Sequence, residues 1–384
     1  MSYRFILNEV SYFGPGSRKE LPNVLARMGA SKVFVVTDKG LLKFGVAQMV
    51  TTVLDEAGIP YDVFSDVKPN PTVSNVKDGL NAFKASNANI IVAIGGGSAI
   101  DTAKGIGIVA NNPEFADIVS LEGCAPTRHK SVPIIALPTT AGTAAETTIN
   151  YVIIDEDKQK KMVCVDPNDI PAVAIIDAEL MYSLPASLTA ATGMDALTHA
   201  IEGYITKGAW EMSDMFEIEA IRMICRYLPT AVSEPKNPDA RNGMAVAQYI
   251  AGMAFSNVGL GLVHGMAHPL GSLFDVPHGV ANALLLPTIM EFNKPACLDK
   301  YPKIAEAMGI NISGMSKEDA SQAACDAVKS LAIKVGIPQH LKELGITATD
   351  IPALSQQALE DVCTPGNPRD VTLEEIKELY TKVL

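Results

Sequence analysis

The sequence predicts a two-part fold, with an α/β half containing a parallel sheet over residues 1–184 and an all-helical half over residues 185–384. Before Pro185, short β-branched runs bounded by glycine alternate with helical patterns. This alternation is typical of parallel strands joined by crossover helices. After Pro185 strand patterns almost disappear, and apolar residues recur at helical spacing. The length of 384 residues also favours two domains over one.

The elements of the first half can be assigned in order. Residues 2–13 alternate in polarity and are expected to form an opening strand or hairpin. Further strands are expected at the β-branched runs 32–38, 61–67, 89–97, 131–143 and 172–185. Helices are expected at the amphipathic stretches 20–29, 46–58 and 71–87, and from Ser98 onward. The charged segment 150–167 is expected to be a hairpin beside the sheet.

Composition limits the compartment and the partners. The chain is 48% hydrophobic and 19% charged, as expected of a well-buried soluble protein. It has no apolar run long enough to span a bilayer and no signal-peptide pattern at its start. A net charge of −12 argues against nucleic acid or an anionic membrane as a partner. Six scattered cysteines without a C-x-x-C motif indicate reduced thiols, so we expect a cytoplasmic protein.

Four of the six histidines fall in two short motifs of the second half. Asp195 and His199 are four residues apart, and so are His264 and His268, so each pair is expected to share one face of a helix. His278 follows in a Pro-His-Gly sequence, where a loop is expected to direct its ring inward. These residues therefore predict two elements folded against each other around one site.

A carboxylate with two or three imidazoles is a ligand set for a divalent transition metal. Oxygen and nitrogen donors without thiolate favour iron(II), manganese or zinc. The alternative is a set of hydrogen-bonded core histidines with a helix carboxylate, which is the commoner situation for any one of these residues alone. The five residues together favour the metal site.

Residues 89–98 have the pattern of a nucleotide-binding turn, in which a buried strand is followed by three glycines and a helix start. Gly96 and Gly97 would let the backbone approach a pyrophosphate, and N–H groups near Ser98 would attract it. The G-x-G-x-x-G fingerprint is absent. A plain tight turn therefore remains an alternative.

Other polar residues follow predicted strands at the edge where open α/β sheets bind ligands. Asp38 could bind a ribose hydroxyl and repel a 2′-phosphate, which favours NAD over NADP, or it could simply cap the next helix. Hydroxyl groups beside a flexible glycine are supplied by Thr139, Thr140 and Thr143. Lys161 lies in a run of lysines, for which a solvated face is the default interpretation.

Several motifs together resemble the iron-containing, group III alcohol dehydrogenases along the whole chain. They are PNPT at 69–72, GGGSAIDTAK at 95–104, PTTAGTAAE at 138–146, GMDALTHAIEGY at 193–204, and HGMAHPLG with the later PHG. The last two motifs are highly specific for the family. NNPEFADIVSLEG and DVCTPGNPR are similar to the branch that interconverts lactaldehyde and 1,2-propanediol. The resemblance implies the dehydroquinate synthase-like fold, with an NAD-binding α/β domain at 1–184 and a helical metal-binding domain at 185–384.

The resemblance also implies roles for individual residues. The metal ligands would be Asp195, His199, His264 and His278. Residues contacting NAD(H) would be Asp38, Asn70, Gly96, Gly97, Ser98, Thr139, Thr140, Thr143, Asn150 and Lys161. His268 would lie near the nicotinamide, and Cys363 would approach the substrate. Fe²⁺ is the expected metal, with Zn²⁺ as the alternative, and the family is expected to form homodimers.

The expected reaction is NAD(H)-dependent interconversion of a small primary alcohol or diol and its aldehyde, with lactaldehyde and 1,2-propanediol as the first candidates. His268 is a candidate proton relay, although it could instead only position the nicotinamide. A general short-chain alcohol dehydrogenase for ethanol, butanol or 1,3-propanediol is the alternative. Two others are a zinc-dependent, dehydroquinate synthase-like lyase and a non-catalytic nucleotide-binding protein. The segments around His264 and His278 contain no Arg or Lys, which favours a small uncharged substrate.

Overall fold

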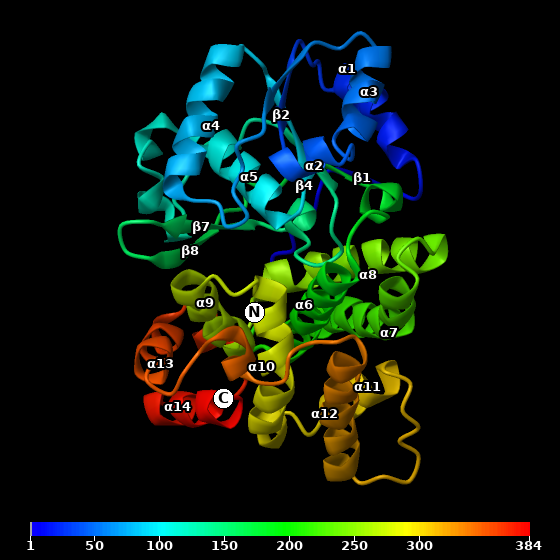
Figure 1. Cartoon of the computed structure of the whole chain (residues 1–384), viewed down its shortest axis with the longest axis vertical. Coiled ribbons are helices and arrows are strands. Elements are labelled where there is room, and N and C mark those ends of the chain that lie inside the picture. Colours follow the sequence, from blue (N-terminus) through cyan, green and yellow to red (C-terminus); the bar gives the residue numbers. More distant parts are fainter. Residues whose placement is uncertain (1) are drawn as a thin grey trace. The chain divides into compact units, whose positions relative to one another are not determined.

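The chain divides into two compact units, one ending at Ser183 and one running from Leu184 to Leu384. The structure is a computed structural model that describes residues 2–384. Figure 1 colours the first unit from blue to green and the second from green to red. All described strands lie in the first unit, and the second is helical, which confirms the predicted fold class.

A six-stranded parallel sheet forms the centre of the first unit. In spatial order its strands are β1 (Val10–Phe13), β9 (Val173–Ile176), β6 (Ile134–Pro138), β4 (Ile90–Gly95), β2 (Val33–Val36) and β3 (Tyr61–Phe64). Every residue of β2, β4, β6 and β9 is buried, because these runs of Val, Ile and Ala are covered on both faces. The opening strand is shorter than the expected 2–13 and lies at the edge of the sheet, paired with β9.

A second, three-stranded sheet contains the predicted hairpin. Its strands are β5 (Gly123–Cys124), β8 (Lys160–Val165) and β7 (Asn150–Asp155). β7 and β8 pair antiparallel, which confirms the hairpin expected at 150–167.

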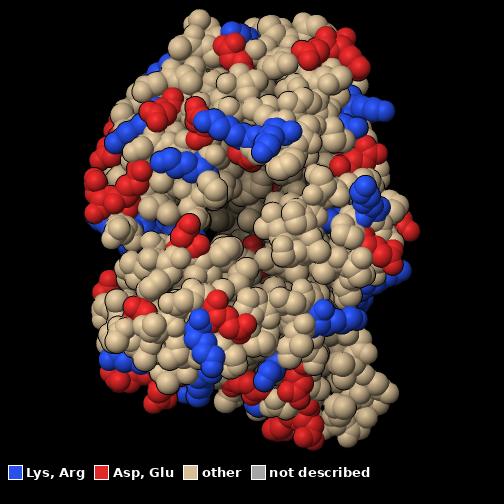
Figure 2. Space-filling view, viewed as in Figure 1, with Lys and Arg blue, Asp and Glu red and all other residues tan. Residues whose placement is uncertain are grey.

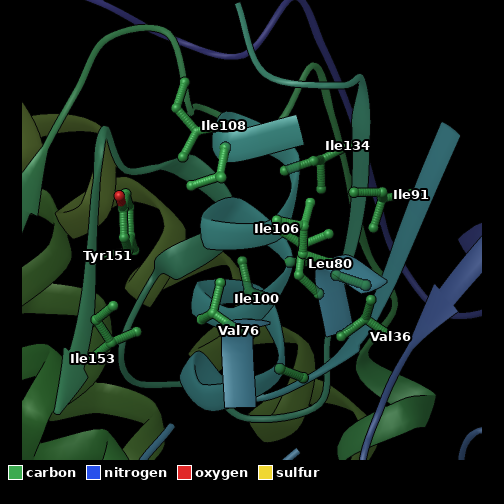
Figure 3. Packing of buried hydrophobic residues seen from close by; sticks show 14 of the residues in the cluster. Val36, Val76, Leu80, Ile91, Ile100, Ile106, Ile108, Ile134, Tyr151 and Ile153 are labelled. Carbon is green, nitrogen blue, oxygen red and sulfur yellow. The ribbon is translucent and has the colours of Figure 1, made fainter. Parts of the chain in front are cut away.

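The helices of the first unit are α1 (Leu21–Arg27), α2 (Lys39–Lys43), α3 (Gln48–Glu56), α4 (Val73–Ser86) and α5 (Gly97–Asn111). α5 is buried along most of its length and packs against α4 and the sheet. Figure 3 shows Ile106 of α5, Leu80 of α4 and Ile91 of β4 in this core cluster. The sequence did not predict α2, which has a single turn of helix and is too short for a clear apolar period.

The strand order creates a topological switch point. The chain runs outward from β2 to β3, then returns past β2 to β4 and continues to β6. In open parallel sheets, ligands bind outside the carboxyl ends of the strands at such a reversal. Asp38 follows β2 and Gly96 follows β4, so two of the expected cofactor residues lie at this reversal.

The second unit consists of helices joined by loops and 3-10 turns. They are α6 (Ala186–Ile205), α7 (Glu211–Ser233), α8 (Pro238–Val258), α9 (Leu262–Phe274), α10 (His278–Asn293), α11 (Tyr301–Ala307), α12 (Lys317–Lys334), α13 (Ile351–Glu360) and α14 (Leu373–Lys382). α6, α7 and α8 pack against one another, and α10 contacts both α6 and α9. α6 is buried along nearly all of its second half, so side chains there face other protein groups.

Charged side chains of both signs are interspersed over the visible face in Figure 2. Within residues 2–384, no single helix has the length and apolar composition needed to cross a membrane. α8 and α9 meet that criterion only as a pair, and they are bent by 101° at their junction.

Candidate functional site

Four side chains that could bind a metal meet inside the second unit. They are Asp195 and His199 on α6, His264 on α9 and His278 on α10. Each offers a ligand atom, and these atoms lie within 4.8 Å of one another. Asp195, His199 and His264 are buried, whereas the side chain of His278 is 27% exposed. The i, i+4 spacing on α6 directs its two residues to one side of the helix.

His278 reaches this group from a helix, and the expectation that it lies in a loop is wrong. It is the first residue of α10, and Pro277 precedes it with a φ of −57° that already suits a helix start. The next residue, Gly279, allows α10 to approach α6 closely. A Cβ at Gly279 would lie 2.4 Å from the carbonyl oxygen of Ala191 and 3.3 Å from the Cβ of Asp195.

The lone pairs of this group converge on the amide of Asn282, which is fully buried on α10. Its Nδ2 donates to Asp195 Oδ1 at 2.7 Å and lies 3.1 Å from His264 Nε2 and 3.2 Å from His278 Nε2. Three acceptor atoms from three helices thus face one point. This arrangement suits a cation, because a cation would satisfy all three lone pairs at once.

Glu202 fixes the orientation and tautomer of His264. Its Oε2 lies 2.6 Å from His264 Nδ1, and its Oε1 accepts from the Val263 backbone N–H at 2.6 Å. With the imidazole proton held on Nδ1, the Nε2 lone pair of His264 is available to a metal. A carboxylate behind a metal-binding histidine usually raises its basicity and holds its ring in place.

The donor set therefore fits the metal that the sequence implies. One carboxylate oxygen and three imidazole nitrogens are typical ligands for iron(II) or zinc, and no thiol belongs to this group. The rings are held by packing: His199 stacks on Phe255 with centroids 4.2 Å apart and on His264 at 4.7 Å. The geometry is thus fixed by the helices themselves.

Glu202→Gln is expected to weaken metal binding by about 10–100-fold, because the amide removes the charge behind His264. The measurement is the dissociation constant of Fe²⁺ or Zn²⁺ by competition with a chelator. Glu217→Gln is the matched control, since Glu217 is also buried and burial, with the charge of Asp214, raises its pKa well above the usual value. Equal metal affinity in Glu202→Gln and the wild type would contradict the role of Glu202.

His268 lies beside the four-residue group and forms a pair with Asp361. His268 Nδ1 lies 2.8 Å from Asp361 Oδ2, and its ring stacks with that of His278 at 5.5 Å. Burial alone would raise the pKa of Asp361, but the charge and hydrogen bond of His268, with hydrogen bonds from Cys363, lower it. The carboxylate therefore stays ionised and holds the His268 proton on Nδ1.

Cys363 lies in the turn after α13, next to Asp361. Its backbone N–H donates to Asp361 Oδ1 at 2.9 Å. Burial raises the pKa of the Cys363 thiol well above its usual value, and the charges of Asp361 and Glu202 act in the same direction. The group is therefore a protonated thiol at neutral pH.

The glycine turn after β4 packs against the predicted threonines in the first unit. A Cβ at Gly96 would lie 3.2 Å from Thr140 side-chain atoms, and one at Gly97 would lie 3.0 Å from Thr143 Cγ2. A Cβ at either position would be in tight contact with a hydroxyl-bearing side chain, so glycine lets the turn pack closely beside Thr140 and Thr143. The turn also begins α5, so its N–H groups have the arrangement that binds phosphate.

Other expected cofactor residues follow the carboxyl ends of β2, β4 and β6. Ser98 Oγ donates to the carbonyl of Pro69, which precedes Asn70 in the chain. The Thr139 N–H donates to the carbonyl of Gly95 at 3.0 Å. Asp38 Oδ1 accepts from the Leu41 N–H at 2.9 Å, so Asp38 does cap a helix. The cap uses one carboxylate oxygen and is compatible with a second role for the group.

Asn150 and Lys161 lie on the hairpin strands β7 and β8. The carbonyl of Asn150 accepts from Lys104 Nζ at 2.8 Å, which ties β7 to α5. Lys161 is only 9% exposed, so the default interpretation of a solvated lysine is wrong for this residue. Its charge lies close enough to Asp101 to favour the ionised form of that carboxyl.

Sequence reasoning missed Glu202, Asn282 and Asp361. Glu202 follows His199 by three residues on the same helix, so helical spacing alone could have indicated it. Asn282 follows His278 by four residues, but that signal requires knowing that His278 begins a helix. Asp361 lies 93 residues from His268, and no local pattern connects them.

Comparison with known proteins identifies the family of this chain. The iron-containing alcohol dehydrogenase family matches residues 8–178, and the C-terminal part of the Fe-containing alcohol dehydrogenase family matches residues 189–384. The chain belongs to the iron-containing alcohol dehydrogenase family. It is 56% identical over 380 residues to lactaldehyde reductase of Escherichia coli strain K12, covering 99% of both chains.

Other relatives of this iron-containing alcohol dehydrogenase are similar over the same length. The 1,3-propanediol dehydrogenase of Citrobacter freundii is 45% identical, with 99% of each chain covered. The crystal structure of a 1,3-propanediol oxidoreductase has a TM-score of 0.97 and 43% identity, with both chains covered completely. An alcohol dehydrogenase from Oenococcus oeni has the same TM-score with 38% identity, also over both whole chains. The protein is thus an oxidoreductase that acts on alcohols and aldehydes.

Proposed function

We propose that this protein interconverts lactaldehyde and 1,2-propanediol with NAD(H) and a divalent metal. Iron(II) is the first candidate for that metal. The observation that carries the proposal is the convergence of Asp195, His199, His264 and His278 on one buried point. The 56% identity to a lactaldehyde reductase supports the choice of substrate. The absence of Arg and Lys from the segments around His264 and His278 supports a small, uncharged substrate.

Each group has a defined task in this proposal. Iron(II) held by the four ligands would supply a Lewis acid for the substrate oxygen, and NADH would supply the hydride. His268 keeps a proton on Nδ1 through Asp361, so its Nε2 can accept the alcohol proton during oxidation and return it during reduction. Cys363, three residues after the end of α13, would approach the substrate.

His268→Ala is expected to lower kcat by roughly 10²-fold while leaving the Kd for NADH within about threefold of the wild type, because a positioned acid–base contributes that much. Steady-state kinetics and fluorescence titration with NADH measure the two quantities. Free imidazole should restore part of the rate by replacing the lost ring. An unchanged kcat with a raised KM for NADH would instead show that His268 only positions the nicotinamide.

Asp38→Asn is expected to raise the ratio of kcat/KM with NADPH to that with NADH by about tenfold or more, because loss of one close repulsion with the 2′-phosphate is worth 1.4 kcal/mol or more. Asparagine caps helices as well as aspartate does, so α2 and the thermal unfolding temperature should be unchanged. An unchanged cofactor ratio in a variant of normal stability would leave Asp38 with its capping role only.

A general short-chain alcohol dehydrogenase is the second candidate, favoured by the 45% identity to a 1,3-propanediol dehydrogenase. Comparing kcat/KM for lactaldehyde, acetaldehyde, butanal and 3-hydroxypropanal under one set of conditions separates the two. The proposal requires lactaldehyde to be the best of these substrates. A higher kcat/KM for 3-hydroxypropanal than for lactaldehyde would favour the general short-chain alcohol dehydrogenase instead.

We further propose that the protein forms a homodimer through the edge of its six-stranded sheet. β1 is one of the two edge strands, and the apolar side chains of Val10 and Phe13 are 45% and 46% exposed there. Exposed apolar edge strands are normally paired or covered. Light scattering after gel filtration should therefore give twice the mass of the chain, 40.7 kDa, and a monomer mass would refute the proposal.

A further inference from the structure

A second group of possible metal ligands lies next to the four-residue group and shares no residue with it. It consists of His268 on α9, Asp361 at the end of α13 and Cys363 in the following turn. Each side chain offers one ligand atom, and the three atoms lie within 4.8 Å of one another. His268 and Asp361 are buried, and Cys363 is half-buried.

The three donors are arranged around one carboxylate. Asp361 Oδ2 lies 2.8 Å from His268 Nδ1, and Asp361 Oδ1 accepts from the backbone N–H of Cys363 at 2.9 Å. The imidazole nitrogen therefore faces Asp361, and the sulfur lies within 4.8 Å of the other two donor atoms.

The turn carrying Cys363 packs closely against α9. Thr364 Oγ1 donates to the carbonyl of Ala358 at 2.6 Å. A Cβ at Gly265 on α9 would lie 2.1 Å from Thr364 Oγ1, so only glycine allows α9 and the turn to come this close. Packing thus brings the three donors close together before any ion binds.

We propose that His268, Asp361 and Cys363 form a second metal site, selective for thiophilic divalent ions such as Zn²⁺. Imidazole, carboxylate and thiolate are all zinc ligands, and water can take the fourth position of the tetrahedron. Thiolate favours zinc over iron(II), whereas the four-residue group offers only oxygen and nitrogen. The two neighbouring groups therefore differ in the metal that they prefer.

Binding can be written with atoms and charges balanced. The S–H proton of Cys363 leaves to solvent as the sulfur–zinc bond forms, and the imidazole proton moves from Nδ1 to Nε2. The carboxylate and thiolate charges then neutralise Zn²⁺. With zinc–ligand distances of about 2.0–2.3 Å, donor atoms of a tetrahedron lie roughly 3.3–3.8 Å apart. The 2.8 Å contact between His268 and Asp361 must therefore open by about 0.5–1 Å.

One consequence rests on the proposed function of His268. Zinc on Nδ1 places the ring proton on Nε2, the atom that must accept the alcohol proton. A zinc ion at this site would therefore stop turnover even when the four-residue group holds iron.

Anaerobic titration of the metal-free protein with Co²⁺ tests the site. Only the second group contains sulfur, so a thiolate-to-cobalt charge-transfer band in the near ultraviolet reports it alone. We expect two cobalt ions per chain and this band in the wild type. Cys363→Ser and Cys363→Ala should bind one ion without the band, with unfolding of the metal-free protein as the folding check. His199→Ala, which disrupts the first group, should keep the band.

Cys225→Ser is the matched control, because Cys225 is also a half-buried free thiol but lies on α7, outside both ligand groups. It should keep both ions and the band. A single ion per chain without the band in the wild type, or loss of the band in Cys225→Ser but not in Cys363→Ser, would overturn the proposal.

Zinc inhibition separates this proposal from the proposed function. Added zinc should slow the iron-loaded wild type by roughly 10²-fold, the contribution of a proton relay. In the iron-loaded Cys363→Ser variant, added zinc should change the rate by no more than about twofold relative to the same variant without zinc. A second ion and the band without inhibition would support the site and contradict the relay role of His268. If the wild type reduces lactaldehyde normally but binds only one ion, the second metal site would be overturned and the proposed function would stand.

Discussion

Replacing His264 with alanine is expected to remove both the bound metal and turnover while leaving NADH binding intact. His264 is the central proposed ligand of its group: its ring lies 4.7 Å from that of His199 and 5.3 Å from that of His278. Without it the remaining donors no longer surround one point. Loss of the Lewis acid removes several kcal/mol of transition-state stabilisation, so kcat should fall by roughly 10³-fold or more.

Three measurements on the same sample test this prediction: metal per chain, the Kd for NADH and kcat. Asp195→Asn is the second variant, because it keeps the size of the side chain and removes only its charge. His129→Ala is the control, since His129 is exposed and belongs to neither ligand group. Retained turnover by metal-free His264→Ala would contradict the Lewis-acid mechanism.

Lys104→Met is expected to lower the unfolding temperature of the first unit by roughly 10 °C. Lys104 is fully buried on α5, and its Nζ donates to Thr148 O at 2.7 Å, Thr148 Oγ1 at 3.0 Å and Asn150 O at 2.8 Å. It also lies 3.9 Å from Asp169 Oδ1, deep in the same core. Removing one partner of such a buried group costs about 3–5 kcal/mol. Each kcal/mol shifts the transition of a domain this size by about 2–4 °C.

The same substitution should also weaken NADH binding, because Lys104 holds the carbonyl of Asn150, a residue proposed to contact the cofactor. Burial already raises the pKa of Asp101 to about 6, against the opposing charges of Lys104 and Lys161, so loss of Lys104 should raise it further. Lys130→Met is the control: that side chain is 79% exposed and pairs with Glu9 at the surface. Calorimetry measures the unfolding temperature of the first unit in both variants. Equal temperatures in Lys104→Met and Lys130→Met would show that Lys104 contributes no net stability.

Much of the metal group could be predicted because its signals are local. Asp195 and His199 lie on one face of a helix through their spacing, and His264 stands at the start of another. The role of Asn282 could not be predicted, since it depends on the close approach of α10 to α6 that Gly279 permits. The pairing of His268 with Asp361 likewise depends on tertiary structure, because α13 lies far along the chain.

The fold shows the same division between local and distant information. Buried β-branched runs such as 89–97 identified the strands, because a parallel sheet covered on both faces requires continuous apolar residues. The helical pattern did not reveal α2, whose single turn depends on the cap from Asp38. Residues 2–9 alternate in polarity yet form no strand, since only Val10–Phe13 lies along β9. Alternating polarity alone did not predict how much of this segment pairs with β9.

The most direct test of the proposed function follows deuterium into the product from NADH that carries deuterium at both C4 positions. The metal-free protein is loaded anaerobically with iron(II) or zinc in parallel and given lactaldehyde with labelled NADH or NADPH. We predict rapid turnover with iron and NADH, slow turnover with NADPH, and deuterium on C1 of 1,2-propanediol. The absence of NADH oxidation with either metal, or a product without deuterium, would contradict metal-dependent hydride transfer to lactaldehyde.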